Sequence, residues 1–521
     1  MLKNLLSVVF SMSLSAAAFA QGVGDLDPSF STDGKYTEDF GFQDNLTDVK
    51  VQPDGKIIVA GTALNTAFSG QLLIKRINAD GTSDNTFSDD GTVIINDYTE
   101  SYAYECKILP DGKILVAGSI ANEMYQFSLA VFKLNADGSF DTSFGVDGRS
   151  IISLVTGDTQ VYDMEVDANG KIIVAGNMVT LGEYGKPMVC RLNADGTMDT
   201  TFANNGVATY DVTNDDNVFR NVAIDNDGRI VAAGHWGLGI TGDGQINNDA
   251  LVVRLLPDGS VDNTFGDAGK LIFPVHNSID DLFGLEITSI NEIYVCGYTI
   301  MPDATFDGLL AKVDEYGSLV ASVGGDGIVE FNAGPQDVFA DVILYEDQLY
   351  IGGSSGGFMF ENRDFLLMRY ELDGTIDESF GLSGLTLTTI FASFDDANAL
   401  TIQADGKILL AGKGNNSTNN DIAVTRYLND ANVHVNEQGQ LSYQLFPSLL
   451  KGGEWIHAQW TNGLFTECRV MNLNGQLVHQ ENIAPSARGL QVSTENWASG
   501  MYHVVMLNNG MPVASSKVII H

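Results

Sequence analysis

Seven positions at matching places along the chain carry oxygen-bearing side chains that could bind a cation or cap a turn. They are Asp44, Ser101, Thr159, Asn217, Asp280, Asp337 and Asp395. Carboxylate oxygens are the ligands that Ca²⁺ prefers, and the same residue types also bond the backbone of nearby turns. The sequence favours turn caps, and it leaves open a calcium site formed by Asp44, Asp280, Asp337 and Asp395.

A second set of candidates lies in segments whose length varies between otherwise similar stretches of the chain. The longest segment runs from 235 to 249 and begins with His235 and Trp236, and others carry Tyr125, Phe127 and Phe360. Variable loops on a rigid scaffold commonly carry binding residues. These side chains are therefore the ligand-binding candidates, for stacking on a sugar or gripping a peptide. The alternative is that the rings pack onto their own loops.

No recognisable catalytic motif occurs in the sequence. Only His235, His276 and His434 precede residue 437, and none has the spacing of a metal pair or of a base beside a nucleophile. We therefore assign no catalytic residue and expect a protein that is not an enzyme. The alternative is a hydrolase or lyase that acts on polysaccharide with carboxylates of the variable loops, and a clustered His on that face would favour it.

All these candidates belong to a stretch of about 58 residues that recurs seven times. A unit of this length cannot bury its own apolar face, so it must stack against its neighbours. Each copy contains a block such as Pro53–Gly61 that ends in glycine. The equivalent glycines are Gly61, Gly118, Gly176, Gly234, Gly297, Gly353 and Gly412.

Each copy also contains four segments of alternating or β-rich apolar sequence. In the first copy they are residues 46–52, 56–63, 71–79 and 91–98. Such segments predict short antiparallel strands, and Asp-Gly pairs between them suit hairpin turns. Four strands in each of seven copies predict an all-β fold, a seven-bladed β-propeller over residues 21–436.

The two ends of the repeat region complement each other. The last copy stops near Asp430 without its final strand, and the missing part stands at the start of the chain, in Asp27–Lys35. We therefore expect the N-terminal segment to supply the outer strand of the last blade and to close the ring.

Two charged columns recur beside these strands. A basic residue ends the third strand of each copy, and an Asp follows it by seven or eight residues in most copies, as in Arg76 and Asp84. A structural ion pair within each blade is the expected reason. A Phe column, represented by Phe87, is expected to pack between blades.

Composition restricts the compartment and the partners. The net charge is −40, and almost all of it lies in the repeats, which argues against nucleic acid and anionic membranes as partners. Residues 1–20 combine Lys3, an apolar run and small residues, as expected of a secretory signal peptide. No other apolar run is long enough to span a membrane. The four cysteines replace core residues or stand alone, and we expect buried free thiols.

The repeats resemble a known family. Leu134–Gly145, read as Leu-Asn-Ala-Asp-Gly-Ser-Phe-Asp-Thr-Ser-Phe-Gly, together with the Asp-Gly-Lys-Ile block, is similar to the delta-60 type of propeller-like repeat of bacterial exported proteins. The resemblance covers about residues 24–430. The fifth copy departs from it, with Val320 and Val323 in place of Asp and Phe. The resemblance implies a propeller and implies no particular activity.

Residues 437–521 differ from the repeats and contain no Asp. Their alternating segments predict a small β-sandwich. Met471–Val478, Gly500–Val505 and the final Lys517–His521 are similar to the type A sorting domain of the type IX secretion system. That resemblance implies passage through the type IX secretion machinery and a secreted protein, either released or attached to the outer cell surface. An ordinary binding or adhesion sandwich is the alternative.

Together these features predict an exported, non-enzymatic propeller that serves as a binding or adhesion module for an extracellular glycan or protein.

Overall fold

The computed structural model describes residues 22–429 and 443–520, apart from 156, 181, 211–216, 241–245, 277, 358–361, 447–448, 452, 461–464, 473–476, 485–486, 488 and 509–510. The expected signal peptide, residues 1–20, and the expected domain boundary at 436/437 lie outside the described residues. The chain forms two compact parts, residues 22–430 and residues 431–521. The described residues form strands and no helix, so the predicted all-β class is confirmed.

The repeat region consists of units of four antiparallel strands, numbered here in chain order. The first strands of the seven units are β2 (Gln43–Val51), β6 (Glu100–Ile108), β10 (Gly157–Val166), β14 (Val218–Ile224), β18 (Asp280–Ile287), β22 (Gln336–Tyr345) and β26 (Asp395–Ile402). The second strands are β3 (Ile57–Leu64), β7 (Ile114–Ala121), β11 (Ile172–Thr180), β15 (Ile230–Ile240), β19 (Ile293–Ile300), β23 (Gln348–Gly356) and β27 (Ile408–Asn415).

The third strands are β4 (Gly70–Ile77), β8 (Phe127–Leu134), β12 (Lys186–Leu192), β16 (Ile246–Leu255), β20 (Phe306–Val313), β24 (Arg363–Glu371) and β28 (Asn420–Tyr427). The fourth strands of the first six units are β5 (Thr92–Ile95), β9 (Arg149–Ile152), β13 (Val207–Thr209), β17 (Lys270–Phe273), β21 (Ile328–Phe331) and β25 (Leu385–Thr388). The four strands predicted in the first copy are confirmed to within three residues at each end.

The start of the chain lies against the last unit. Strand β1 (Lys35–Glu38) pairs antiparallel with β28, from Lys35 opposite Thr425 to Glu38 opposite Ile422. Leu26 forms a further bridge with Tyr427. Residues from the start of the repeat region thus pair with the third strand of its last unit.

Basic residues that end the third strands fasten neighbouring units together. Arg254 Nε donates to Asp262 Oδ2 at 2.8 Å, and its guanidinium lies 4.6 Å from the ring centre of Phe265. The same arginine donates from Nη1 to the Glu315 carbonyl of the next unit at 2.5 Å. Gly317 of that next unit leaves room for Phe265, because a Cβ there would lie 3.0 Å from the ring. We call this arrangement the Arg–Asp–Phe latch.

The latch recurs around the repeat region, so the predicted ion pairs and Phe packing are confirmed. Its ion pairs are Arg76–Asp84, Lys133–Asp141, Arg191–Asp199, Arg254–Asp262, Arg369–Asp377 and Arg426–Asp27. The fifth unit departs, as its sequence predicts. There Lys312 pairs with Glu292 at 2.9 Å and lies 5.2 Å from the ring centre of Tyr294, whose hydroxyl donates to the Leu372 carbonyl of the sixth unit.

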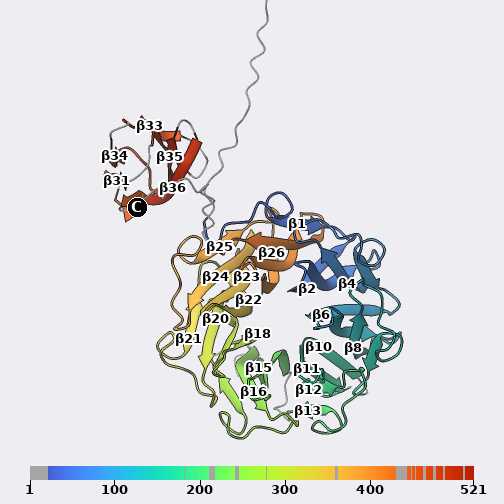
Figure 1. The fold of residues 1–521 in the computed structure, drawn as a ribbon. Coiled ribbons are helices and arrows are strands. Elements are labelled where there is room, and N and C mark those ends of the chain that lie inside the picture. The colour runs from blue at the N-terminus through green and yellow to red at the C-terminus, as the bar shows by residue number, and fades with distance from the viewer. Residues whose placement is uncertain are drawn as a thin grey trace, which may run out of the picture. The chain divides into compact units, whose positions relative to one another are not determined.

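Figure 1 shows the labelled strands β2, β6, β10, β18, β22 and β26 arranged around a central opening. Apolar residues from adjacent units fill the space between their sheets, in clusters that join neighbouring units. All four cysteines are buried and form no disulfide, as predicted for the core positions Cys106, Cys190 and Cys296.

The C-terminal part contains two sheets, ordered β29-β31-β34 and β30-β36-β35-β32-β33. Its strands are β29 (Tyr443–Phe446), β30 (Leu449–Leu450), β31 (Trp455–Trp460), β32 (Glu467–Asn472), β33 (Leu477–Asn482), β34 (Gly489–Ser493), β35 (Gly500–Asn508) and β36 (Met511–Ile520). Ile456 and Val492 from the first sheet share one buried cluster with Val470 and Val504 from the second. Among the described residues, none forms a helix that could cross a membrane.

Candidate functional site: the central cavity

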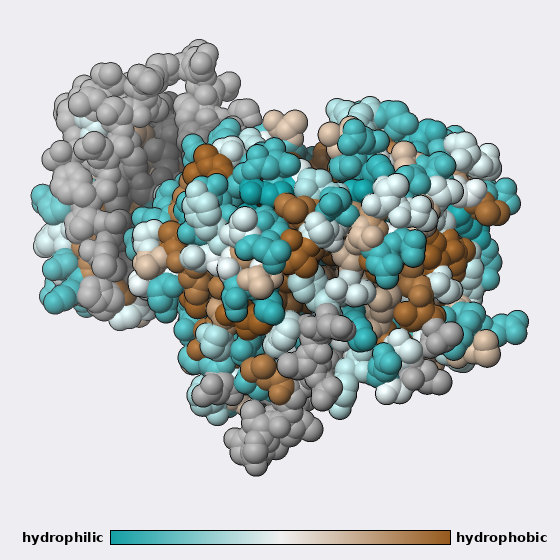
Figure 2. All heavy atoms as spheres, turned by 90° about the horizontal axis from the view of Figure 1, so that it is seen from below, coloured by the Kyte–Doolittle hydropathy of each residue, from teal (hydrophilic) through white to brown (hydrophobic). Residues whose placement is uncertain are grey.

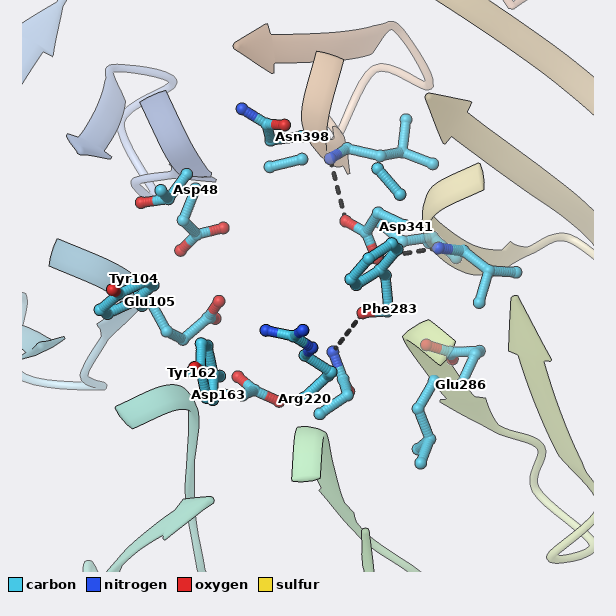
Figure 3. Close-up of a pocket in the computed structure, with 18 of the residues that line it drawn as sticks. Asp48, Tyr104, Glu105, Tyr162, Asp163, Arg220, Phe283, Glu286, Asp341 and Asn398 are labelled. Atoms are coloured by element: carbon cyan, nitrogen blue, oxygen red, sulfur yellow. Dashed lines mark hydrogen bonds between the residues drawn. The ribbon is translucent and has the colours of Figure 1, made fainter. Parts of the chain in front are cut away.

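A large cavity of the repeat region lies where the first strands converge. Its volume is about 1020 Å³, and residues from all seven first strands line it. Figure 3 shows Glu105, Asp163 and Arg220 pointing into it. This size lies in the range of small-molecule sites.

A β-bulge in each first strand aims one side chain at the cavity. The pairing with the second strand shifts between Leu46 and Asp48, and the same irregularity recurs in every unit. The residues at the bulge are Thr47, Tyr104, Tyr162, Arg220, Phe283, Ala340 and Asn398, and all line the cavity. A bulge adds one unpaired residue and re-aims it, so these positions carry side chains inward.

The repeat glycines are needed because of this bulge. A Cβ on Gly61 would lie 2.1 Å from the carbonyl oxygen of Asn45, and a Cβ on Gly176 would lie 1.9 Å from that of Gln160. No real Cβ tolerates such an approach. The glycine that marks each repeat in the sequence is therefore the residue that lets the bulge form and the cavity wall take its shape.

Aromatic bulge residues form an arc on one side of the cavity. The ring centres of Tyr104 and Tyr162 lie 5.4 Å apart. The Arg220 guanidinium lies between two rings, 4.7 Å from Tyr162 and 5.5 Å from Phe283. Tyr298 continues the arc, with its ring centre 5.7 Å from that of Phe283. We call these residues, together with Phe306 at 5.1 Å from Tyr298, the aromatic arc.

Arg220 is held in place by the fifth unit but keeps donor capacity. Its Nη2 donates to Asp281 Oδ2 at 3.2 Å, and its buried Nε has no hydrogen-bond partner. Burial opposes ionisation of Asp281, but His235 and Arg220 hold the pKa of this carboxyl below its usual value. The Arg220 side chain as a whole is 27% exposed, and a stacked guanidinium that keeps part of its surface in a cavity is suited to bind an acceptor oxygen of a ligand.

Carboxylates on the other inward positions bind neighbouring units. Asp48 accepts from the Cys106 backbone N–H at 2.8 Å, and Asp163 and Asp341 accept in the same way from Val222 and Leu400 at 2.7 and 2.9 Å. Each bond runs from one first strand to the next. These carboxylates therefore help to hold the units together while they line the cavity.

Charged side chains cluster just after the bulge on the first strands of the first three units. Lys50 lies 3.0 Å from Glu105, and Lys107 lies 3.3 Å from Glu105 and 2.9 Å from Glu165. Burial and the nearby Asp48 raise the pKa of Glu105 despite these lysines. Burial, with help from a neighbouring carboxylate, raises the pKa of Glu286 to about 8. The cavity therefore favours cations or protons over anions.

The predicted residues His235 and Trp236 lie in the second strand of the fourth unit, both 8% exposed. His235 Nδ1 lies 2.9 Å from Asp281 Oδ1, so the structure brings this histidine to the carboxylate that holds Arg220. Trp236 belongs to a core cluster with Phe219 and is covered by Lys270, 5.1 Å from its ring centre. Its ring packs inside the protein, as the alternative interpretation of the loop aromatics expects.

The other aromatic candidates differ from one another. Tyr125 is 62% exposed at the tip of a turn. Phe127 is half-buried, with its ring centre 6.0 Å from that of Tyr102 and its N–H bound to Asp158. Phe360 lies outside the described residues. Of the three, Tyr125 is the one whose ring the described structure leaves open to solvent.

Asp44, Asp280, Asp337 and Asp395 are fully buried, and each accepts backbone N–H groups from the turn before its strand. Asp44 accepts from Phe40 at 2.6 Å, and Asp395 accepts from Ile390 at 2.7 Å. These bonds are those of turn caps. Within the described residues, no group of three His, Cys, Asp or Glu is arranged to hold a metal ion, and the calcium hypothesis stays a prediction.

Sequence reasoning missed the cavity wall. Tyr104, Tyr162, Arg220 and Phe283 share a repeat position but are of three residue types, so no column of identical residues marks them. The signal that could have found them is their fixed distance, fourteen residues before the repeat glycine, as in Tyr104 and Gly118.

Comparisons with known families identify both parts of the chain. A family model described as a domain of unknown function (DUF5122) beta-propeller matches residues 52–87, 109–144, 168–202, 226–265, 347–380 and 403–432. The chain carries DUF5122 β-propeller repeats. The matched segments leave out residues 266–346, which contain the whole fifth unit, where Val320 and Val323 depart from the pattern.

The second family model, a secretion system C-terminal sorting domain, matches residues 453–521. The predicted type IX sorting domain is thereby confirmed. The protein is therefore a secreted or cell-surface protein that interacts with the type IX secretion machinery. Its repeat region is of the propeller type.

Solved structures with a similar fold are distant. A fungal alcohol oxidase in complex with copper has 12% identity and a TM-score of 0.45, covering 96% of this chain and 100% of its own. An ulvan lyase bound to a GlcA–Rha3S saccharide has 10% identity and a TM-score of 0.41, covering 79% and 96%. At these scores neither supports an inference about function. No curated protein sequence matches the chain.

Proposed function

We propose that this protein is an exported binding module whose ligand, an extracellular glycan or protein, enters the central cavity from the side of the aromatic arc. The observation that carries the proposal is Arg220, which lines the cavity, stacks between Tyr162 and Phe283 and keeps 27% of its side chain exposed. Rings supply flat contact surfaces and the guanidinium supplies donors, a combination that suits sugar hydroxyls and peptide carbonyls alike.

The proposal includes the scaffold. Residues 1–20 would be removed as a signal peptide, residues 21–436 would form seven blades, and β1 would complete the last blade by its pairing with β28. The mature protein would then act in the extracellular space or on the outer cell surface, delivered by residues 437–521.

The bonding of the cavity carboxylates favours binding over catalysis. Asp48, Asp163 and Asp341 each accept a backbone N–H of the neighbouring unit, and Glu105 lies between two lysines. A hydrolase needs one carboxyl to donate a proton and another to act as a base or nucleophile. Carboxylates committed to structural bonds are poorly placed for either role.

A glycan and peptide array probed with the full mature chain tests the proposal. We expect binding that falls at least tenfold, about 1.4 kcal/mol, in Arg220→Lys, because lysine keeps the charge and loses the planar stacked donors. Tyr316→Phe, at an exposed turn of the fifth unit, serves as the control. Equal binding by Arg220→Lys and the unaltered chain would contradict the proposed site.

One observation favours the alternative, a polysaccharide hydrolase or lyase. His235 lies 2.9 Å from the buried Asp281, and a carboxylate that orients a histidine is an arrangement found in general bases. Incubation of the protein with polysaccharides, followed by assays of reducing ends and of unsaturated products, tests this. The protein would be an enzyme if it cleaves a polysaccharide and if His235→Gln abolishes the cleavage while retaining binding on the array.

A further inference from the structure

Two exposed aromatic rings stand on turns that share the same hydrogen bonds. Phe68 and Tyr125 are 63% and 62% exposed and occupy the same place in the loops between second and third strands of the first two units. Their backbone φ angles are +62° and +57°, in the left-handed region. The equivalent residue in the fifth unit is the small Ala304, also left-handed.

The turns hold these rings firmly. Asn65 Oδ1 accepts from the N–H groups of Ala67 and Ser69, at 2.8 and 3.1 Å. Asn122 Oδ1 makes the same bonds to Met124 and Gln126. A left-handed turn position favours glycine, and a bulky side chain there is strained. The turns thus present large rings to water where small residues would fit the backbone better.

The two rings lie at the same end of the units as the aromatic arc. Phe306, which lines the cavity, follows directly after the turn that contains Ala304. Since Ala304 is the equivalent of Phe68 and Tyr125, the loops that carry the two rings border the same end of the cavity. Phe68 is also braced, because its ring meets that of Phe42 edge-on at 4.4 Å.

Single exposed rings separated by polar residues suit a sugar chain better than a protein surface. Figure 2 shows hydrophobic side chains interspersed with hydrophilic ones on the face it displays. Protein interfaces bury contiguous apolar patches, whereas each ring can stack on one sugar of an extended chain. The net charge of −40 disfavours a polyanionic chain.

We propose that Phe68 and Tyr125 are outer subsites for an extended polysaccharide without anionic groups, whose end or side reaches the aromatic arc. This inference rests on the proposed function and adds the ligand class. It predicts that the protein selects polymers, because a long chain can contact the aromatic arc and the outer rings at the same time.

Titration of the full mature chain with neutral oligosaccharides of two and six sugars, from gluco-, xylo- and manno-series, tests the inference, with chondroitin sulfate as the anionic probe. We expect a six-sugar ligand to bind at least tenfold more tightly than its two-sugar counterpart. The double variant Phe68→Ala/Tyr125→Ala is expected to lose this difference and to keep the two-sugar affinity. Tyr316→Ala, which removes an equally exposed ring at the opposite turns, is the control and is expected to keep it.

The outcomes separate the two proposals. Equal affinity for two and six sugars, or a length dependence that survives the double variant, would overturn the outer subsites and leave the cavity site standing. Preference for chondroitin sulfate would overturn the ligand class. If the protein binds only peptides, and Arg220→Lys abolishes this binding, the polysaccharide ligand class is overturned but the cavity remains the binding site. Absence of all binding would overturn both.

Discussion

The Arg–Asp–Phe latch and the cavity wall are built from the same repeat but differ in how much they vary. The latch uses one set of residue types in six units, with lysine as the basic residue in the second. The bulge positions of the wall carry seven side chains of six types. The latch must fit one geometry in every unit, since each arginine meets the turn of the next. The bulge side chains line the cavity, and no single geometry fixes their type: Thr47 and Asn398 bond the neighbouring unit, whereas Arg220 stacks on aromatic rings.

The two regions also treat charge differently. Hydrogen bonds from Lys113 and Ser143 lower the pKa of the latch residue Asp141 to about 2. In the cavity, burial raises the pKa of Glu286 to about 8 and that of Asp341 to about 6. Folding thus makes the latch carboxyl of Asp141 a stronger acid, and it makes Glu286 and Asp341 weaker ones. The following predictions use this contrast.

The largest expected effect comes from breaking one latch. Arg254 is 2% exposed, and Arg254→Ala leaves Asp262 without its cation and the Glu315 carbonyl without its donor. Breaking a buried ion pair costs about 3–5 kcal/mol. Calorimetric unfolding of the full chain should show this loss, with ligand affinity at low temperature unchanged. Lys186→Ala, from an exposed pair with Glu183, is the control and should cost less than about 0.5 kcal/mol. A latch variant as stable as the control would show that the latch is dispensable.

A single glycine should affect both regions at once. Gly176→Ala places a Cβ 1.9 Å from the Gln160 carbonyl, and the bulge that carries Tyr162 must shift. We expect destabilisation of about 3 kcal/mol and weaker ligand binding, because the aromatic arc moves with the bulge. Gly182→Asn, at a position with open space around it and a φ of +87°, is the matched control. If the folded Gly176→Ala protein binds ligand as well as the unaltered chain, the repeat glycine does not position the binding site.

The opposite pKa shifts predict a stability maximum at mildly acidic pH. Latch carboxyls have lowered pKa values when folded, so their contribution is lost as the pH falls below about 4. Glu286 has a raised pKa when folded, so its contribution is present below the unfolded value and is lost as the pH rises towards 8. The melting temperature of the full chain should therefore fall on both sides of about pH 5.

Two substitutions test which carboxyl groups cause the fall in stability on the acid and alkaline sides of the pH–stability curve. Glu286→Gln should flatten the alkaline limb by on the order of 2 kcal/mol and leave the acid limb. Asp141→Asn should lower stability at neutral pH and flatten the acid limb. A curve that rises steadily from pH 4 to pH 8.5 would mean that the raised cavity pKa values do not govern stability.

The repeat columns explain how far the sequence alone reaches. Residues such as Asp84 and Phe87 recur in register, so pairing and packing could be inferred from spacing. Arg220 could not be found in this way, because its partners Phe283 and Asp281 belong to the next unit and its own position varies. Trp236 stands at the start of a long variable segment, so the sequence placed it among the loop candidates. Its ring nevertheless packs in the core. The recurring columns therefore predict the scaffold, whereas the residues of the candidate site vary from unit to unit and form no column.

The smallest expected effect concerns the rings of the outer turns, which belong to neither the latch nor the wall. Tyr125→Gly relieves a left-handed backbone and removes a ring that is 62% exposed, so stability should rise by about 0.5 kcal/mol. Phe68→Gly should gain less, because it also loses the contact with Phe42. Paired calorimetric scans of the two variants measure the difference. If the rings serve only the fold, both variants should lose stability. If Tyr125→Gly gains stability, the strained ring is retained for a role other than stabilising the fold.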